Sequence, residues 1–154
     1  MKLKNNKGRT IKSRKKVAKI EEALSQNSKA FINEHSFYNG NDVSPVLWNF
    51  FTRITLVSKT VNERLTIDLN LGFQDFRNGI EKEISHIIIA EVKQEKASIN
   101  SHFIKVMRKY HVQQSGMSKY CIGTALTNKE VKSNNFKERI LKIKKLKNDR
   151  RISA

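Results

Sequence analysis

The chain has 154 residues, with 31 Lys and Arg against 14 Asp and Glu and a formal net charge of +17. Its longest compact apolar run, Ile87-Ile88-Ile89-Ala90, is far shorter than the roughly 20 residues of a membrane-spanning helix. The single cysteine, Cys121, excludes an internal disulfide and a Cys-based zinc site. No apolar segment follows the basic N-terminus, so no secretory signal is predicted and a cytoplasmic location is expected.

The positive charge is concentrated at the two ends of the chain. Residues 1–20 hold nine basic and no acidic residues, and residues 137–154 hold eight basic and two acidic residues. Such ends indicate a polyanionic partner. Nucleic acid, anionic lipid and polyphosphate would each fit, and basic ends that only keep the protein soluble are the alternative.

Residue periodicity predicts a set of strands in the first two thirds of the chain. A charged strand, a weak helix, an antiparallel hairpin and a third strand follow one another. Their expected ranges are Gly8 to Val17, Glu21 to about Ser36, Trp48 to Ser58 with Asn62 to Phe73, and Ser85 to Gln94.

Helices are predicted after the strands. One follows Ser98, a short one is N-capped by Ser118, and a last one opens at Asn135 with Glu138 as a capping box. An antiparallel sheet followed by helices gives an α+β fold class.

The hairpin has one polar face. Alternation places Leu65, Ile67, Leu69 and Leu71 opposite Arg64, Thr66, Asp68 and Asn70, with Arg53 nearby on the first strand. A polar face commonly meets solvent. If the sheet closes into a barrel, the same face lines an interior where Arg and Lys need anions, which would make a phosphate site. Both interpretations stand at this point.

Two further positions could carry chemistry. Glu91 shares a face with Ile87, Ile89 and Lys93; it forms an ion pair with Lys93 or provides an oxygen ligand for Mg²⁺ or Mn²⁺. Ser118 and Lys119 open a helix, where backbone N–H groups, the hydroxyl and the ammonium could converge on a phosphate.

Several functional classes lack support. The four histidines have no metal-ligand spacing, and neither a hydrolase triad nor a phosphate-binding glycine loop can be assembled. No RNA-binding motif is present, so nucleic acid is not the favoured partner.

Five motifs in order resemble the polyphosphate polymerase domain of the vacuolar transporter chaperone (VTC) family, within the triphosphate tunnel (CYTH) superfamily. The chain looks like a bacterial member. The motifs are Gly8-Arg9-Thr10-x-Lys12-x-Arg14, Arg53-Ile54-Thr55-Leu56-Val57, Glu63-Arg64-Leu65-Thr66-Ile67-Asp68, Glu91-Val92-Lys93 and Ser118-Lys119-Tyr120-Cys121-Ile122-Gly123.

The resemblance implies a tunnel-like antiparallel β-barrel with C-terminal helices, which binds ATP and polyphosphate with Mn²⁺ or Mg²⁺. It assigns Arg53, Arg64 and Lys119 to catalysis and Glu91 to the metal. It assigns phosphate binding to five further residues: Arg9, Lys12, Arg14, Lys93 and Ser118.

The resemblance also implies that the front of the domain is missing. Residues 1–147 would be the C-terminal portion of the domain, and residues 148–154 a basic tail. We therefore expect an incomplete barrel, weak or no polymerase activity alone, and either self-association or completion by a separate N-terminal piece. A non-enzymatic protein that binds polyphosphate or RNA, and an inorganic triphosphatase of the same superfamily, remain the alternatives.

Overall fold

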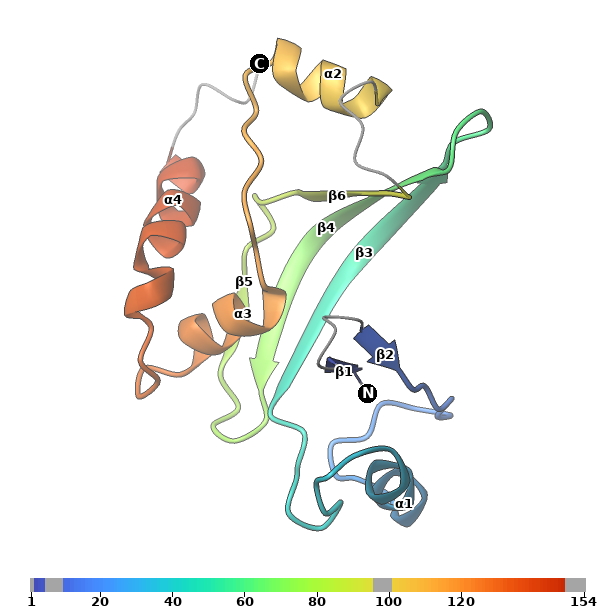
Figure 1. Ribbon diagram of the computed structural model, residues 1–154. Coiled ribbons are helices and arrows are strands. Elements are labelled where there is room, and N and C mark those ends of the chain that lie inside the picture. Colours follow the sequence, from blue (N-terminus) through green and yellow to red (C-terminus); the bar gives the residue numbers. More distant parts are fainter. Residues whose placement is uncertain (1, 5–9, 96–100, 149–154) are drawn as a thin grey trace. The chain divides into compact units, whose positions relative to one another are not determined.

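The computed structural model describes residues 2–4, 10–95 and 101–148 of the chain (Figure 1). The chain divides into two compact units, residues 1–46 and 47–154. Arg9, Lys12 and Arg14 belong to the first unit, and the other site residues named above belong to the second.

The first unit contains a small strand pair and one helix. Strand β1 (Lys2–Lys4) pairs antiparallel with β2 (Thr10–Lys12), and helix α1 (Gln26–His35) follows. The predicted strand does not continue through residues 13–17, where consecutive basic residues leave no apolar face to bury. Helix α1 begins later than predicted, because the Ser25 hydroxyl caps it by accepting a hydrogen bond from Ser28 N at 3.2 Å.

The second unit is built on a four-stranded antiparallel sheet, and the predicted hairpin is its main part. Strands β3 (Leu47–Val57) and β4 (Glu63–Asp75) form the hairpin. The other side of β4 pairs with β5 (Glu81–Glu83) near its end and with β6 (Ile89–Gln94) near its start. Over the described residues the sheet does not close. The α+β class and the expected incomplete barrel are therefore confirmed.

A β-bulge interrupts the hairpin and changes which residues share a face. Thr52 pairs with Leu69 and Phe50 pairs with Gly72, so Asn70 and Leu71 together oppose Phe51. Asn70 has a left-handed backbone, with φ 53°. Leu71 therefore lies on the face of Asp68, and its predicted place beside Leu69 is wrong.

The third strand is shorter than predicted. It begins at Ile89, and Ile84 and Ile87 before it belong to a turn in which Ile87 N donates to Ile84 O at 3.0 Å. Ile84 and Ile87 are both buried. They contribute to the core from this turn, outside the sheet.

Four helical segments follow the sheet: α2 (His102–Lys109), α3 (Lys119–Thr127), the 3-10 turn η1 (Asn134–Phe136) and α4 (Lys137–Asn148). Ser101 caps α2, accepting from Ile104 N at 3.3 Å. The predicted capping box is wrong, because Asn135 lies inside η1 and this turn leads directly into α4. None of the described helices is both long and apolar enough to cross a membrane.

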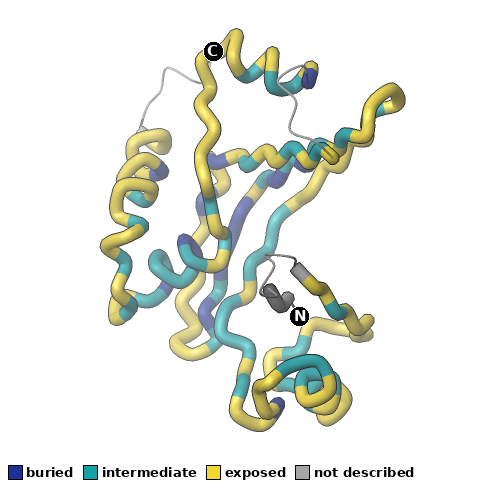
Figure 2. The backbone as a smooth tube through the Cα atoms, viewed as in Figure 1, coloured by how far each residue is buried: buried dark blue, intermediate teal, exposed yellow. Residues whose placement is uncertain are grey.

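The core lies between the end of β4 and the helices. Figure 2 shows buried residues along β4 and in α3. The buried apolar side chains are Leu71, Phe73, Ile84, Ile87, Ile122 and Ile143. Gly123 of α3 is required for this packing, because a Cβ there would overlap the Phe73 ring.

Candidate functional site

The strand register gathers charged side chains on one face of the sheet. Residues directly opposite each other on neighbouring strands point to the same side. Arg53 opposes Asp68, Thr66 opposes Glu91, and Arg64 opposes Lys93. Since Arg64, Thr66 and Asp68 alternate along β4, all six residues share what we call the charged face. Arg53, Arg64 and Glu91 thus lie on one side of the sheet.

Asp68 is the centre of an ion cluster on this face. Its carboxylate accepts from Arg53 Nε at 2.6 Å and Nη2 at 2.7 Å, and from Lys119 Nζ at 2.5 Å. The side chain of Asp68 is 3% exposed, against 40% for Arg53 and 21% for Lys119. The hydrogen bonds from Arg53, followed by those from Lys119, lower the pKa of Asp68 from 3.8 to about 2. The cluster is therefore ionised at neutral pH, with one excess positive charge.

Phe51 supports both cations of this cluster. Its ring centroid lies 5.0 Å from Arg53 Cζ and 4.6 Å from Lys119 Nζ. Both distances are within the range in which a cation is attracted to an aromatic face. Phe51 and Asp68 together fix the guanidinium and the ammonium, while part of each remains accessible to a ligand.

Helix α3 brings Lys119 to the sheet. Ser118 is the N-cap, as predicted, and its hydroxyl accepts from Cys121 N at 3.3 Å. A lysine in the first turn of a helix is normally unfavourable. Here the Asp68 carboxylate is the anion that accompanies it. The Ser118 hydroxyl can still donate its own hydrogen to a ligand.

Glu91 and Lys93 form the outer part of the charged face. Their side chains pair at 2.9 Å, and each is about half exposed. Arg64, directly opposite Lys93, is exposed and forms no ion pair with any described residue. Two like charges placed opposite each other on a sheet are unfavourable unless an anion joins them. With four cations (Arg53, Arg64, Lys93, Lys119) against two carboxylates (Asp68, Glu91), the site has a net charge of +2.

A metal at this site would have one carboxylate ligand. Among the described residues, no three His, Cys, Asp or Glu side chains cluster to hold an ion. Glu91 Oε1 is used by Lys93, which leaves Oε2 available. A single carboxylate with substrate phosphate oxygens fits Mg²⁺ or Mn²⁺.

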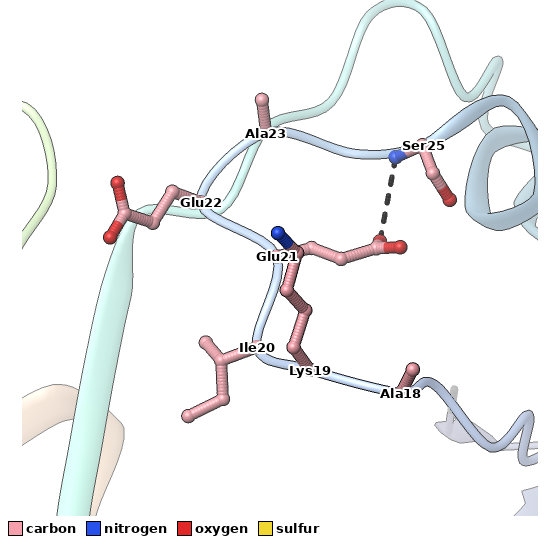
Figure 3. A pocket seen from close by; sticks show the side chains of 7 residues that line it. All are labelled: Ala18, Lys19, Ile20, Glu21, Glu22, Ala23 and Ser25. Carbon is pink, nitrogen blue, oxygen red and sulfur yellow. Dashed lines mark hydrogen bonds between the residues drawn. The ribbon is translucent and has the colours of Figure 1, made fainter.

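The remaining predicted phosphate ligands lie in the first unit. Lys12 and Arg14 are exposed there, and Arg9 lies outside the described residues. A hollow in this unit is lined by residues 18–23 and Ser25, whose N–H donates to Glu21 Oε2 at 3.5 Å (Figure 3). It is formed by one loop and holds none of the predicted site residues.

Asp68 and Phe51 are not among the site residues predicted from the sequence. Asp68 was placed correctly on the polar face, and the hairpin register would have set it opposite Arg53. The contact with Lys119 requires the tertiary position of α3, for which the sequence carries no local signal.

Comparison with known proteins identifies one family. The VTC domain family matches residues 1–128. That span contains both strands of the hairpin, Glu91 and the Ser118-Lys119 pair. No curated protein and no solved structure matches the chain. Because the family match covers most of its length, the chain belongs to the VTC domain family.

Proposed function

We propose that the charged face binds chains of phosphate and that the protein is a polyphosphate polymerase-like domain. In the proposed reaction, a phosphate oxygen at the end of a polyphosphate chain attacks the γ-phosphorus of ATP. The bond from that phosphorus to the β-phosphate bridging oxygen breaks, and ADP leaves with the electron pair. The observation that carries the proposal is the cluster of Arg53 and Lys119 on Asp68, beside Arg64 and Glu91 on the same face.

The side chains have separable roles in this proposal. Arg53 and Lys119, held in place by Asp68, neutralise charge that develops on the transferred phosphoryl group. Arg64 and Lys93 hold neighbouring phosphates, and the Ser118 hydroxyl donates to one phosphate oxygen. Glu91 would hold a divalent ion, which would neutralise phosphate charge and so weaken its repulsion of the nucleophile. VTC domains generally depend on such an ion. Lys12, Arg14 and Arg9 are proposed to bind phosphate as well.

A second candidate function is polyanion binding without turnover. The open sheet of the described residues favours it, because an open face excludes less water than a closed tunnel. An inorganic triphosphatase would use the same residues with water as the nucleophile.

One experiment separates these functions. The full chain is incubated with ATP and Mn²⁺, and the products are analysed for acid-stable polymer and for free phosphate. Polymer supports the polymerase, free phosphate alone supports the triphosphatase, and salt-sensitive binding without product supports a binding protein.

A matched pair of variants assigns the metal role. Glu91→Gln should abolish metal-dependent turnover and leave nucleotide binding largely intact. Glu81→Gln, which removes an exposed carboxylate from β5, should change neither. Unchanged turnover in Glu91→Gln would remove this residue from the mechanism.

A further inference from the structure

Helix α4 carries a concentration of positive charge outside the charged face. Six of its twelve residues are basic and one, Glu138, is acidic. The basic residues, which we call the α4 cations, are Lys137, Arg139, Lys142, Lys144, Lys145 and Lys147. The family match ends at residue 128, so this helix is not part of the matched segment. We propose that the α4 cations form a second binding site, for linear polyphosphate; the identity of this anion rests on the proposed function.

The α4 cations have no ionic partner among the residues that the structure describes. All six are exposed, and none forms an ion pair with a described residue. By contrast, Arg53, Lys93 and Lys119 on the sheet side each have a carboxylate. The helix dipole favours cations in the last turn, where Lys145 and Lys147 lie, but disfavours Lys137 in the first. Since like charges three residues apart repel, an external polyanion would relieve this repulsion.

The packing of α4 presents the cations outward. Ile143 is buried in the core, and Phe136 and Ile140 pack against that core. His86 Nε2 also donates to Ile143 O at 3.0 Å. Leu141 and Leu146 of the same helix remain exposed, but they are five residues apart and do not lie on one side of the helix. A helix that binds a membrane surface presents a broad apolar face to lipid, and two separate leucines do not form one, so a lipid surface is not the favoured occupant.

The residue types favour polyphosphate over nucleic acid. Five of the six α4 cations are lysines, and α4 contains no aromatic residue. Single-stranded nucleic acid is held by aromatic stacking in addition to charge. Lysine acts as a flexible point charge, which suits a linear chain of phosphates without bases.

The first turn of α4 lies close to the entry into α3. An atom at the Cβ position of Gly116 would be 3.8 Å from Arg139 Nη2. Gly116 is two residues before Ser118, the N-cap next to Lys119. A polyphosphate chain on α4 can therefore extend toward the charged face, and α4 would retain a long product while its end stays near the reaction site.

The test compares two variants of the full chain with the same change in net charge. In the first, Lys142, Lys144, Lys145 and Lys147 are all changed to Gln. In the control, four exposed lysines elsewhere in the second unit are changed to Gln: Lys59, Lys82, Lys105 and Lys109. Binding of tripolyphosphate and of long-chain polyphosphate is measured at several salt concentrations.

We expect the α4 variant to lose about tenfold or more in affinity for long-chain polyphosphate, with a salt dependence smaller by about 3 in its log-log slope. The control should bind nearly as the wild type does, and both should bind tripolyphosphate normally. A second variant with Arg at the same four positions should bind long-chain polyphosphate as tightly as the wild type, because the charge is kept. This result would show that the Gln variant loses affinity through lost charge and not through a folding defect.

Three outcomes would overturn the inference. The α4 variant could bind long chains no more weakly than the control. Single-stranded RNA could compete equally and lose the same affinity in the variant, which would identify a nucleic-acid surface. The α4 cations could bind anionic vesicles and fail to bind polyphosphate, which would identify a lipid-binding surface. If tripolyphosphate fails to bind the wild type while the α4 effect on long chains persists, the proposed function fails and the α4 site stands.

Discussion

One face of β4 serves two different purposes along its length. Before the bulge it presents Arg64, Thr66 and Asp68 to a set of charges, and after the bulge it presents Leu71 and Phe73 to the apolar core. Both halves meet α3, which places Lys119 on Asp68 and packs Ile122 and Gly123 in the core. The core therefore positions the site, because the helix that is fixed by apolar packing also carries Lys119.

The largest expected effect on stability comes from a substitution in the apolar half of β4, after the bulge. Phe73→Ala removes a fully buried ring and should lower the free energy of unfolding by about 3–5 kcal/mol. Urea denaturation followed by circular dichroism measures the change. A loss below about 1 kcal/mol would show that α3 is not fixed by this packing.

The stability that the charged half of β4 contributes should depend on pH, and Asp68→Asn tests this. The folded-state pKa of Asp68, about 2, lies below its ordinary value of 3.8. The carboxylate therefore stabilises the fold fully above the ordinary pKa, and this contribution is lost as the pH falls toward 2. At pH 7 the variant should lose about 2 kcal/mol of unfolding free energy.

The difference between the wild type and Asp68→Asn should shrink between about pH 5 and pH 2. Asp42→Asn is the control, since Asp42 is exposed and forms no ion pair with any described residue. A constant difference at every pH would contradict the ion cluster.

Asn70 lies in the bulge between the two halves of β4, and substitutions there should change the unfolding free energy by a smaller amount. Asn70 has φ 53°, a conformation that glycine adopts freely and β-branched residues avoid. Asn70→Val should lower the unfolding free energy by about 1–2 kcal/mol, while Asn70→Gly should change it by no more than about 0.5 kcal/mol. Equal effects of the two substitutions in denaturation would mean that the bulge does not require a left-handed residue.

The hairpin was predictable because alternation of apolar and polar residues is a local signal. The face of each residue from Arg64 to Leu69 followed from that alternation. The bulge at Asn70 interrupts this alternation. The sequence of β4 alone does not show where β3 has one residue fewer. Strand β5 was missed because Glu81–Glu83 is short and exposed. The ion pair of Glu91 with Lys93 was foreseen as one alternative, because both lie on one strand face.

The ion cluster itself depended on contacts between distant segments. Asp68 and Lys119 are 51 residues apart, and their contact follows from how α3 packs against β4. The sequence predicted a phosphate beside Ser118 and Lys119, and the structure places the carboxylate of Asp68 on Lys119.

The most direct test of the account is tripolyphosphate binding to Arg64→Gln, measured by calorimetry. Arg64 is exposed and unpaired among the described residues, so its removal should leave stability unchanged. Lys59→Gln, in the turn between β3 and β4, is the matched control for one lost positive charge. Arg64→Gln should weaken binding by about tenfold, the size of one charge-assisted contact, while Lys59→Gln should bind as the wild type does. Equal affinity in both variants would contradict a phosphate site on the charged face.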